Sequence, residues 1–117
     1  MIRDVDREEL KGMMDSGESF VLIDVLDKND FDREHICGSI NLPMTGIARE
    51  APNLIGKDET VVVYCTGPAC TASSIAAEKL ESLGYKDIWK FAGGIEEWKQ
   101  AGYCLEGSEY EEITAAG

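Results

Sequence analysis

The feature that most constrains the fold of this 117-residue chain is a series of short apolar runs that alternate with helical patterns. Residues 20–25 and 60–64 are nearly continuous in apolar and β-branched side chains, which is typical of strands buried on both faces. This alternation predicts an α/β fold whose central, mostly parallel sheet of about five strands is flanked by helices on both faces. Two further strands are expected at 39–42 and 87–91, and helices at 6–15, 28–34, 46–54, 72–83 and 95–101.

The length of the chain fits a single domain over residues 1–117, with its core at about 6–105 and an acidic, frayed tail at 106–117. Hydrophobic residues make up 44% of the chain, enough to bury a core. No apolar run is long enough to cross a membrane, and the N-terminus turns polar at once, unlike a signal peptide. We therefore expect a cytoplasmic protein.

The formal net charge of −12 limits the partners that the chain can bind. Phosphate backbones and anionic membrane surfaces repel a protein of this charge, so neither nucleic acid nor membrane is an expected partner. The simplest interpretation of the acidity is solubility, and the alternative is selection of a basic partner.

The chain contains four cysteines, which are Cys37, Cys65, Cys70 and Cys104. A disulfide framework is not expected, because the chain is long enough to bury a core and shows no export signal. Cys37 and Cys104 are expected in the core or half-buried. One histidine and scattered cysteines do not form a metal-ligand set, so no metal and no cofactor are predicted.

Cys65 occupies the position that most clearly favours a catalytic role. It follows the strand at 60–64, and a loop with a Gly-Pro pair separates it from the next helix. Ligands of parallel sheets bind beyond the carboxyl ends of strands, and backbone N–H groups at a helix N-terminus stabilise anions. We therefore predict a lowered pKa for a nucleophilic Cys65; the alternative is a small apolar residue that ends a strand. The expected anion cradle consists of Thr66, Gly67, Pro68, Ala69, Thr71, Ala72 and Ser73.

Five segments in this order make the chain resemble the rhodanese family over about residues 6–105. They are Val21-Leu22-Ile23-Asp24-Val25, His35-Ile36-Cys37-Gly38-Ser39-Ile40-Asn41-Leu42-Pro43, Val61-Val62-Val63-Tyr64-Cys65, Ala76-Ala77-Glu78-Lys79-Leu80-Glu81-Ser82-Leu83-Gly84-Tyr85 and Gly93-Gly94-Ile95-Glu96-Glu97-Trp98. The resemblance implies a sulfurtransferase whose cysteine accepts sulfane sulfur as a persulfide and passes it to a nucleophile. The resemblance also implies supporting structural roles for Asp24, which bonds backbone at its strand end, and for His35, which fixes the turn before Gly38.

The chain departs from the family in its active-site loop. Members commonly carry Arg-Ser at the end of a shorter loop, where this chain has Ala72-Ser73, and Arg33 is the arginine that could still approach. Anionic thiosulfate loses a bidentate partner without that guanidinium. We expect weak thiosulfate activity, a thiol-borne sulfur donor or a persulfide-bearing protein as donor, and a thiol acceptor.

The extended Cys-x-Gly-Pro-x-Cys loop places Cys70 as a possible second thiol, which either resolves the persulfide into a disulfide or only packs the loop. Alternatives to sulfur transfer are a Cys65/Cys70 redox protein and a non-catalytic interaction module. Arsenate reduction or phosphate-ester hydrolysis is disfavoured, because relatives with those activities carry Cys-x5-Arg and this chain has Thr71 at that position.

Overall fold

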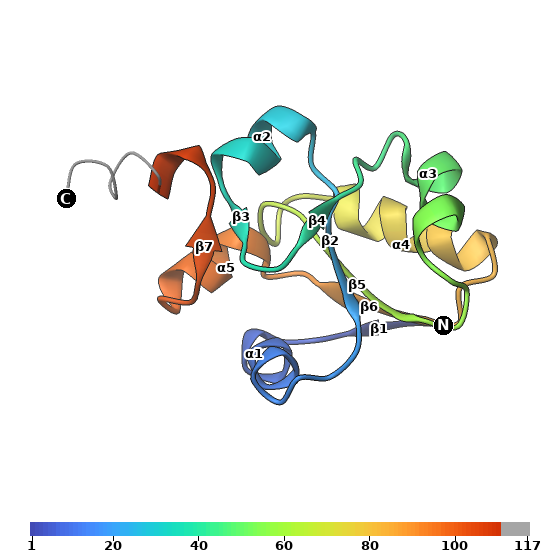
Figure 1. The fold of residues 1–117 in the computed structure, drawn as a ribbon, viewed down its shortest axis with the longest axis horizontal. Helices are drawn as coiled ribbons and strands as arrows, with labels where there is room; N and C mark the ends of the chain where they lie inside the picture. Colours follow the sequence, from blue (N-terminus) through green and yellow to red (C-terminus); the bar gives the residue numbers. More distant parts are fainter. Residues whose placement is uncertain (111–117) are drawn as a thin grey trace.

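A parallel sheet of five strands in the order β1-β6-β5-β2-β4 forms the centre of the molecule (Figure 1). The computed structural model describes residues 1–110. Helices cover both faces of the sheet, so the α/β fold expected from the sequence is confirmed. The strands are β1 (Ile2–Asp4), β2 (Val21–Asp24), β4 (Ile40–Asn41), β5 (Thr60–Tyr64) and β6 (Asp87–Phe91).

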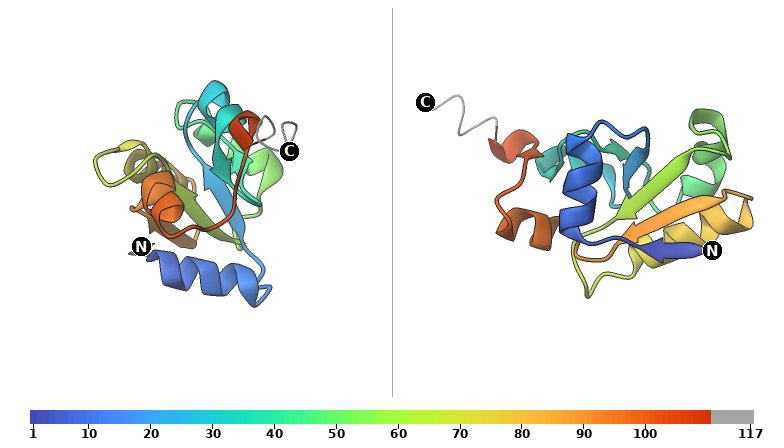
Figure 2. Two further views of the ribbon diagram at one scale, coloured as in Figure 1. Left: turned by 90° about the vertical axis from the view of Figure 1, so that its left-hand side faces the viewer. Right: turned by 90° about the horizontal axis from the view of Figure 1, so that it is seen from below.

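Alternate side chains of the strands enter two separate hydrophobic clusters. Val61 and Val63 of β5 pack under α3 (Ile47–Leu54) and α4 (Ala72–Ser82). Val62 of the same strand faces α1 (Arg7–Asp15) and α5 (Gly94–Gln100) on the other side (Figure 2). This two-sided burial explains why residues 60–64 are apolar or β-branched at nearly every position. Within residues 1–110, no helix is long and apolar enough to cross a bilayer.

The predicted start of α1 is confirmed by a capping box. The carboxylate of Asp6 accepts a hydrogen bond from the backbone N–H of Glu9 at 2.7 Å, and the Glu9 carboxylate accepts one from the backbone N–H of Asp6 at 3.5 Å. Two N–H groups that lack helical partners are thereby satisfied, and the chain turns from β1 into the helix at a defined residue.

A second, antiparallel sheet joins β3 (His35–Ile36) to β7 (Leu105–Glu106), next to α2 (Lys28–Arg33). The expected fraying after Leu105 is therefore wrong for residues 106–110, since Glu106 belongs to β7 and Tyr110 bonds to Glu34. The rest of the predicted tail, 111–117, lies outside the described residues.

The expectation of unpaired Cys37 and Cys104 is also wrong, because the two residues form a disulfide across the β3–β7 pair. The two cysteines are separated by 67 residues, so no local sequence pattern reveals the pairing. Their Cα atoms lie 5.5 Å apart. Such a distance is normal for a disulfide. The interpretation of all four cysteines as free thiols rested on the expected compartment and not on geometry.

The strand order reverses between β2 and β5. After β2 the chain adds β4 on one side, and after β5 it adds β6 on the other. The last residues of these two strands, Asp24 and Tyr64, are register partners. Ligands of open α/β sheets bind beyond the carboxyl ends of strands at such a reversal, so the end of β5, where Cys65 follows, is the place to search for a site.

Candidate active site

Cys65 lies directly after the central strand β5, under the loop of residues 66–71 that leads into α4. Two backbone hydrogen bonds from the start of α5 fix its main chain. The N–H of Ile95 donates to the Cys65 carbonyl at 3.1 Å, and the N–H of Glu96 donates to the Thr66 carbonyl at 2.9 Å. The cysteine at the end of the central strand β5 is thus tied to the start of α5, which follows the neighbouring strand β6.

Gly94 permits this close approach of α5 to the cysteine loop. A Cβ atom at position 94 would lie 2.5 Å from the carbonyl oxygen of Cys65 and 2.7 Å from the backbone nitrogen of Gly67, with φ at +59°. Both the space and the left-handed backbone require glycine here. The Gly93-Gly94 pair is therefore a tight turn between strand and helix.

The thiol of Cys65 has two acceptors within reach and almost no solvent contact. Its Sγ lies 3.5 Å from the carbonyl oxygen of Cys70 and 3.4 Å from Oγ of Ser73, and Cys65 is 2% exposed. Ser73, in the first turn of α4, is also 2% exposed. Cys70 is half-buried, so it is the more accessible thiol of the pair.

The pKa of Cys65 is raised and that of Cys70 is lowered, whereas the sequence predicts a lowered pKa for Cys65. Burial raises the pKa of Cys65, and hydrogen bonding with the Cys70 thiol raises it further, against the lowering effect of Ser73. Partial burial raises the pKa of Cys70, but hydrogen bonds from the Cys65 thiol and from the backbone N–H groups of Ala72 and Thr66 outweigh it, so that pKa is lowered.

The predicted lowering of the Cys65 pKa is therefore wrong, and the reason is geometric. The N–H groups at the start of α4 act on both sulfurs, since the backbone N–H of Ala72 lowers the pKa of Cys70 and that of Ser73 lowers the pKa of Cys65. Cys65 is buried more deeply, however, and its burial outweighs this effect, whereas the pKa of the half-buried Cys70 stays lowered.

The remaining residues of the expected cradle surround the pair. The backbone N–H of Cys70 donates to the Gly67 carbonyl at 3.0 Å, which closes the loop into a turn. Gly67 is buried, Ala72 is half-buried, and the loop is otherwise exposed at Thr66, Pro68, Ala69 and Thr71.

Asp24 ends β2 beside Tyr64 and is fully buried. Its Oδ1 accepts the backbone N–H of Leu26 at 2.9 Å, as expected for a residue that fixes a strand end. Its Oδ2 is buried without a hydrogen-bond partner among the described residues. Burial raises the pKa of Asp24 to about 6, although hydrogen bonds from the Leu26 backbone and the Tyr64 side chain oppose the rise.

A small pocket of about 150 Å³ opens next to Thr66 at this end of the sheet. Arg33 does reach this pocket, but its guanidinium pairs with Asp30 at 2.5 Å. The pocket is therefore net acidic. The sequence does not predict this pocket, because its lining residues come from four distant segments. They are Leu26, Asp30, Arg33, Glu34, Thr66, Ile95 and Glu109.

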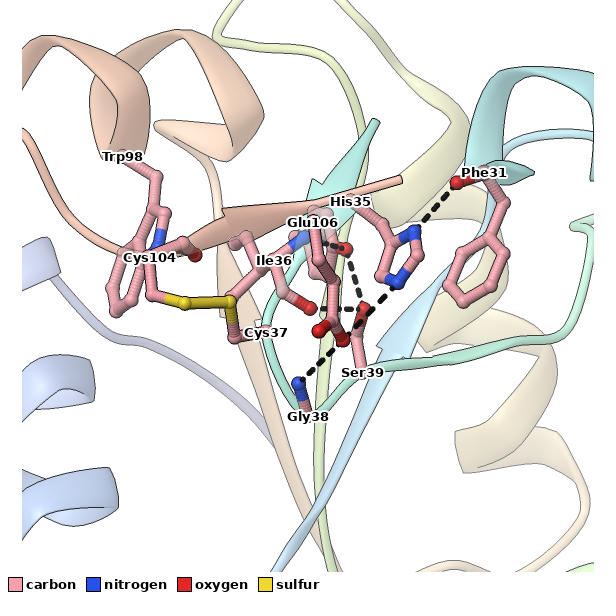
Figure 3. Close-up of polar contacts among 10 residues, drawn as sticks. Phe31, His35, Ile36, Cys37, Gly38, Ser39, Trp98, Cys104 and Glu106 are labelled. Carbon is pink, nitrogen blue, oxygen red and sulfur yellow. Dashed lines mark hydrogen bonds and ion pairs between the residues drawn. A yellow bond between two sulfur atoms is a disulfide. The ribbon is translucent and has the colours of Figure 1, made fainter. Parts of the chain in front are cut away.

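His35 lies in β3, and both of its ring nitrogens contact neighbouring elements. Its Nδ1 is 2.6 Å from the carbonyl oxygen of Phe31, and its Nε2 is 3.3 Å from the Glu106 carboxylate (Figure 3). Ser39 continues this network, since its hydroxyl donates to the Ile36 carbonyl at 2.7 Å. His35 thus connects α2 to β7 rather than acting on the cysteine pair.

The chain matches the Rhodanese-like domain family over residues 6–101. The relative named thiosulfate sulfurtransferase GlpE, from Coxiella burnetii, is 32% identical over 79 residues, which cover 68% of this chain and 71% of that protein. The rhodanese-like domain of Alr3790 from Anabaena has a solved structure with 28% identity and a TM-score of 0.85, covering 94% of this chain and 83% of that one.

Two further relatives are longer proteins. A probable adenylyltransferase/sulfurtransferase, MoeZ of Mycobacterium tuberculosis, is 35% identical over 77% of this chain, which spans 23% of MoeZ. The HTH-type transcriptional regulator Rv0324 of the same species is 31% identical over 87% of this chain, which spans 44% of the regulator. The chain thus covers less than half the length of either relative.

Proposed function

This chain belongs to the rhodanese-like domain family, and from that premise we propose that it is a sulfurtransferase that carries sulfane sulfur on Cys65. A donor persulfide R–S–SH transfers its outer sulfur to the Cys65 thiol, which gives Cys65–S–SH and R–SH. A thiol acceptor R′–SH then takes that sulfur as R′–S–SH and leaves the Cys65 thiol. No external oxidant or reductant is consumed. The observation that carries the proposal is the position of Cys65 at the end of the central strand, where the strand order reverses.

Access to Cys65 requires the loop of residues 66–71 to move, because the residue is 2% exposed in this state. The exposed loop side chains have few buried contacts to lose when they move. Cys70 supports the chemistry beside it, since its lowered pKa provides a thiolate at the mouth of the site. That thiolate can attack a Cys65 persulfide, which forms a Cys65–Cys70 disulfide and releases hydrosulfide.

The donor class follows from the charges around the pocket. Glu34 and Glu109 line it, and the one arginine is paired with Asp30. Thiosulfate carries two negative charges and finds no free guanidinium there. A persulfide carries at most one negative charge on its sulfur atoms and does not need a guanidinium to bind them, so a persulfide on a small thiol or on a protein is the better donor, with a thiol as acceptor.

A second candidate function is thiol–disulfide redox chemistry between Cys65 and Cys70. The observation that favours it is the hydrogen bond that brings the Cys65 thiol to the Cys70 main chain at 3.5 Å. A non-catalytic interaction module is the third candidate, and the burial of Cys65 is the feature in its favour.

The compartment expected from the sequence is the cytoplasm, and the Cys37–Cys104 disulfide counts against a permanently reducing one. Trapping thiols in intact cells with an alkylating reagent that adds mass separates the two cases. A fully alkylated pair supports a reducing cytoplasm, and an unreactive pair supports an oxidising compartment.

The test of the proposed function compares two donors, each with its own acceptor. Sulfur transfer from glutathione persulfide to a thiol is expected to be fast, and transfer from thiosulfate to cyanide is expected to be slow. Rapid thiosulfate turnover would contradict the assignment of the donor class. No transfer from either donor would favour the interaction module.

A further inference from the structure

The C-terminal segment of residues 102–110 lies beside β3 and the end of α2, far in sequence from both (Figure 1). Its β7 pairs with β3 through only two register pairs, His35 with Glu106 and Ile36 with Leu105. Beyond β7, the hydroxyl of Tyr110 donates to the Glu34 carboxylate at 2.6 Å. A ladder this short is weak on its own, because isolated two-stranded pairs are marginally stable in water.

The Cys37–Cys104 disulfide is the covalent link that holds this segment in place. It lies beside the main-chain bond in which the N–H of Cys37 donates to the Cys104 carbonyl at 3.2 Å. Cys104 is exposed and Cys37 half-buried, so a reducing thiolate can reach the bond from solvent. An exposed disulfide across a weak ladder can be opened without unfolding the sheet.

The attached segment forms part of the pocket beside the cysteine loop. Glu109 of the segment lines the pocket together with Thr66, the residue that follows Cys65. Glu34, another lining residue, bonds to Tyr110 and pairs with Lys99 at 2.8 Å. Release of the segment would therefore remove one carboxylate from the pocket and leave Glu34 without its Tyr110 contact.

We propose that Cys37–Cys104 is a site of thiol–disulfide exchange that acts as a reducible clasp on the wall of the active-site pocket. Its co-substrate is a dithiol: R(SH)₂ reduces the protein disulfide to two thiols and becomes the cyclic disulfide RS₂. The closed clasp holds residues 102–110 against β3, and the open clasp releases them. The effect on sulfur loading rests on the proposed function, whereas the release of the segment does not.

Hydrogen exchange read by mass spectrometry tests the clasp directly. The oxidised protein, the protein reduced with a phosphine and the Cys37→Ser/Cys104→Ser variant are compared over peptides that span 103–110 and 60–64. Opening is expected to speed exchange in 103–110 by about tenfold or more, while β5 still exchanges much more slowly than 103–110 although the whole fold is less stable without the disulfide. Equal protection of 103–110 in all three samples would overturn the proposal. So would exchange of β5 as fast as that of 103–110, because the disulfide would then hold the whole fold.

The fluorescence of Trp98 provides a second measurement of the release of residues 102–110. Its Nε1 donates to the Cys104 carbonyl at 2.9 Å, and its ring meets Tyr103 edge to face at 4.8 Å. In a Trp89→Phe background, reduction is expected to shift the emission of Trp98 to longer wavelength as its neighbours leave. An unchanged emission maximum in the reduced protein would contradict release of the segment.

Sulfur loading then separates the clasp from the proposed function. Loading from glutathione persulfide is measured without reductant on the oxidised protein and on the Cys37→Ser/Cys104→Ser variant. The variant is expected to load about threefold faster, since one partly screened carboxylate leaves the path of an anionic donor. Equal loading rates in the two proteins would show that the Cys37–Cys104 disulfide does not control the pocket. Absence of loading in both proteins, with release of 103–110 intact, would sink the sulfurtransferase assignment and leave the exchange site standing.

Discussion

The Sγ of Cys65 lies 3.5 Å from the carbonyl oxygen of Cys70 and is covered by the loop that carries that second cysteine. The two thiols therefore form a pair in which the Cys65 sulfur is buried and the Cys70 sulfur is nearer solvent. Burial raises the pKa of the first, and hydrogen bonds lower the pKa of the second.

Selective alkylation is expected to find Cys70 before Cys65. The lowered pKa of Cys70 increases its thiolate fraction at neutral pH, and the raised pKa of Cys65 decreases its own. Iodoacetamide at pH 7, followed by peptide mapping, should label Cys70 first, and Cys65 labelling should rise as the pH approaches the pKa of a free thiol. Faster labelling of Cys65 at pH 7 would contradict this order.

Ser73→Ala is expected to slow the reactions of Cys65. The Ser73 hydroxyl is 3.4 Å from the Cys65 sulfur, and its hydrogen bonding lowers the pKa of that thiol. Loss of one such bond should slow alkylation of Cys65 at neutral pH by about fivefold. Ser74→Ala is the matched control, since the Ser74 hydroxyl accepts from Lys90 at 3.1 Å instead. Equal rates of Cys65 alkylation in Ser73→Ala and Ser74→Ala would show that the Ser73 hydroxyl does not affect the Cys65 thiol.

Asp24→Asn is expected to change how stability depends on pH. Because the folded pKa of Asp24 is raised to about 6, the folded state binds the proton more tightly than the unfolded chain. Its stabilising effect is complete below the unfolded value of about pH 4 and is lost as pH rises through about 6. Asparagine does not titrate, so the variant should gain up to about 3 kcal/mol in free energy of unfolding relative to wild type between pH 4 and pH 8.

Urea unfolding at several pH values measures this difference. The Oδ1 bond to the Leu26 N–H can be kept by asparagine, so the backbone turn at the end of β2 is preserved. A pH-independent difference between Asp24→Asn and wild type would show that the buried carboxyl does not titrate in this range.

Removal of the disulfide by Cys37→Ser/Cys104→Ser is expected to lower the free energy of unfolding by about 4 kcal/mol, because a link between residues this far apart restricts the unfolded chain. Denaturant unfolding with and without reductant checks this. Wild type should become less stable with reductant and the double variant should not change. A double variant as stable as the oxidised wild type would contradict the expectation.

The sequence predicts the elements whose signals are local. The run at 60–64 and the capping box at Asp6 have the structure expected of them, because burial on two faces and cap chemistry act within a few residues. The strands β1, β3 and β7 were missed, since they have two or three residues and depend on distant partners.

The sequence predicts where Cys65 and Asp24 lie in the fold, but not the acidity of the thiols. Their place at the ends of β5 and β2 follows from the alternation of strands and helices. The pKa order of Cys65 and Cys70 depends on how deeply the fold buries each sulfur, and spacing alone does not determine this. The pairing of Cys37 with Cys104 depends on the tertiary fold in the same way.

Intact mass spectrometry after brief exposure to glutathione persulfide tests the central claim most directly, with wild type, Cys65→Ser and Cys70→Ser compared side by side. A gain of one sulfur atom is expected in Cys70→Ser, mapped to the peptide that contains Cys65, and no gain is expected in Cys65→Ser. Wild type is expected to gain the same sulfur atom, with loss of two hydrogen atoms instead in the fraction in which Cys70 has resolved the persulfide. A sulfur adduct that persists in Cys65→Ser, or none in any of the three proteins, would contradict sulfur transfer through Cys65.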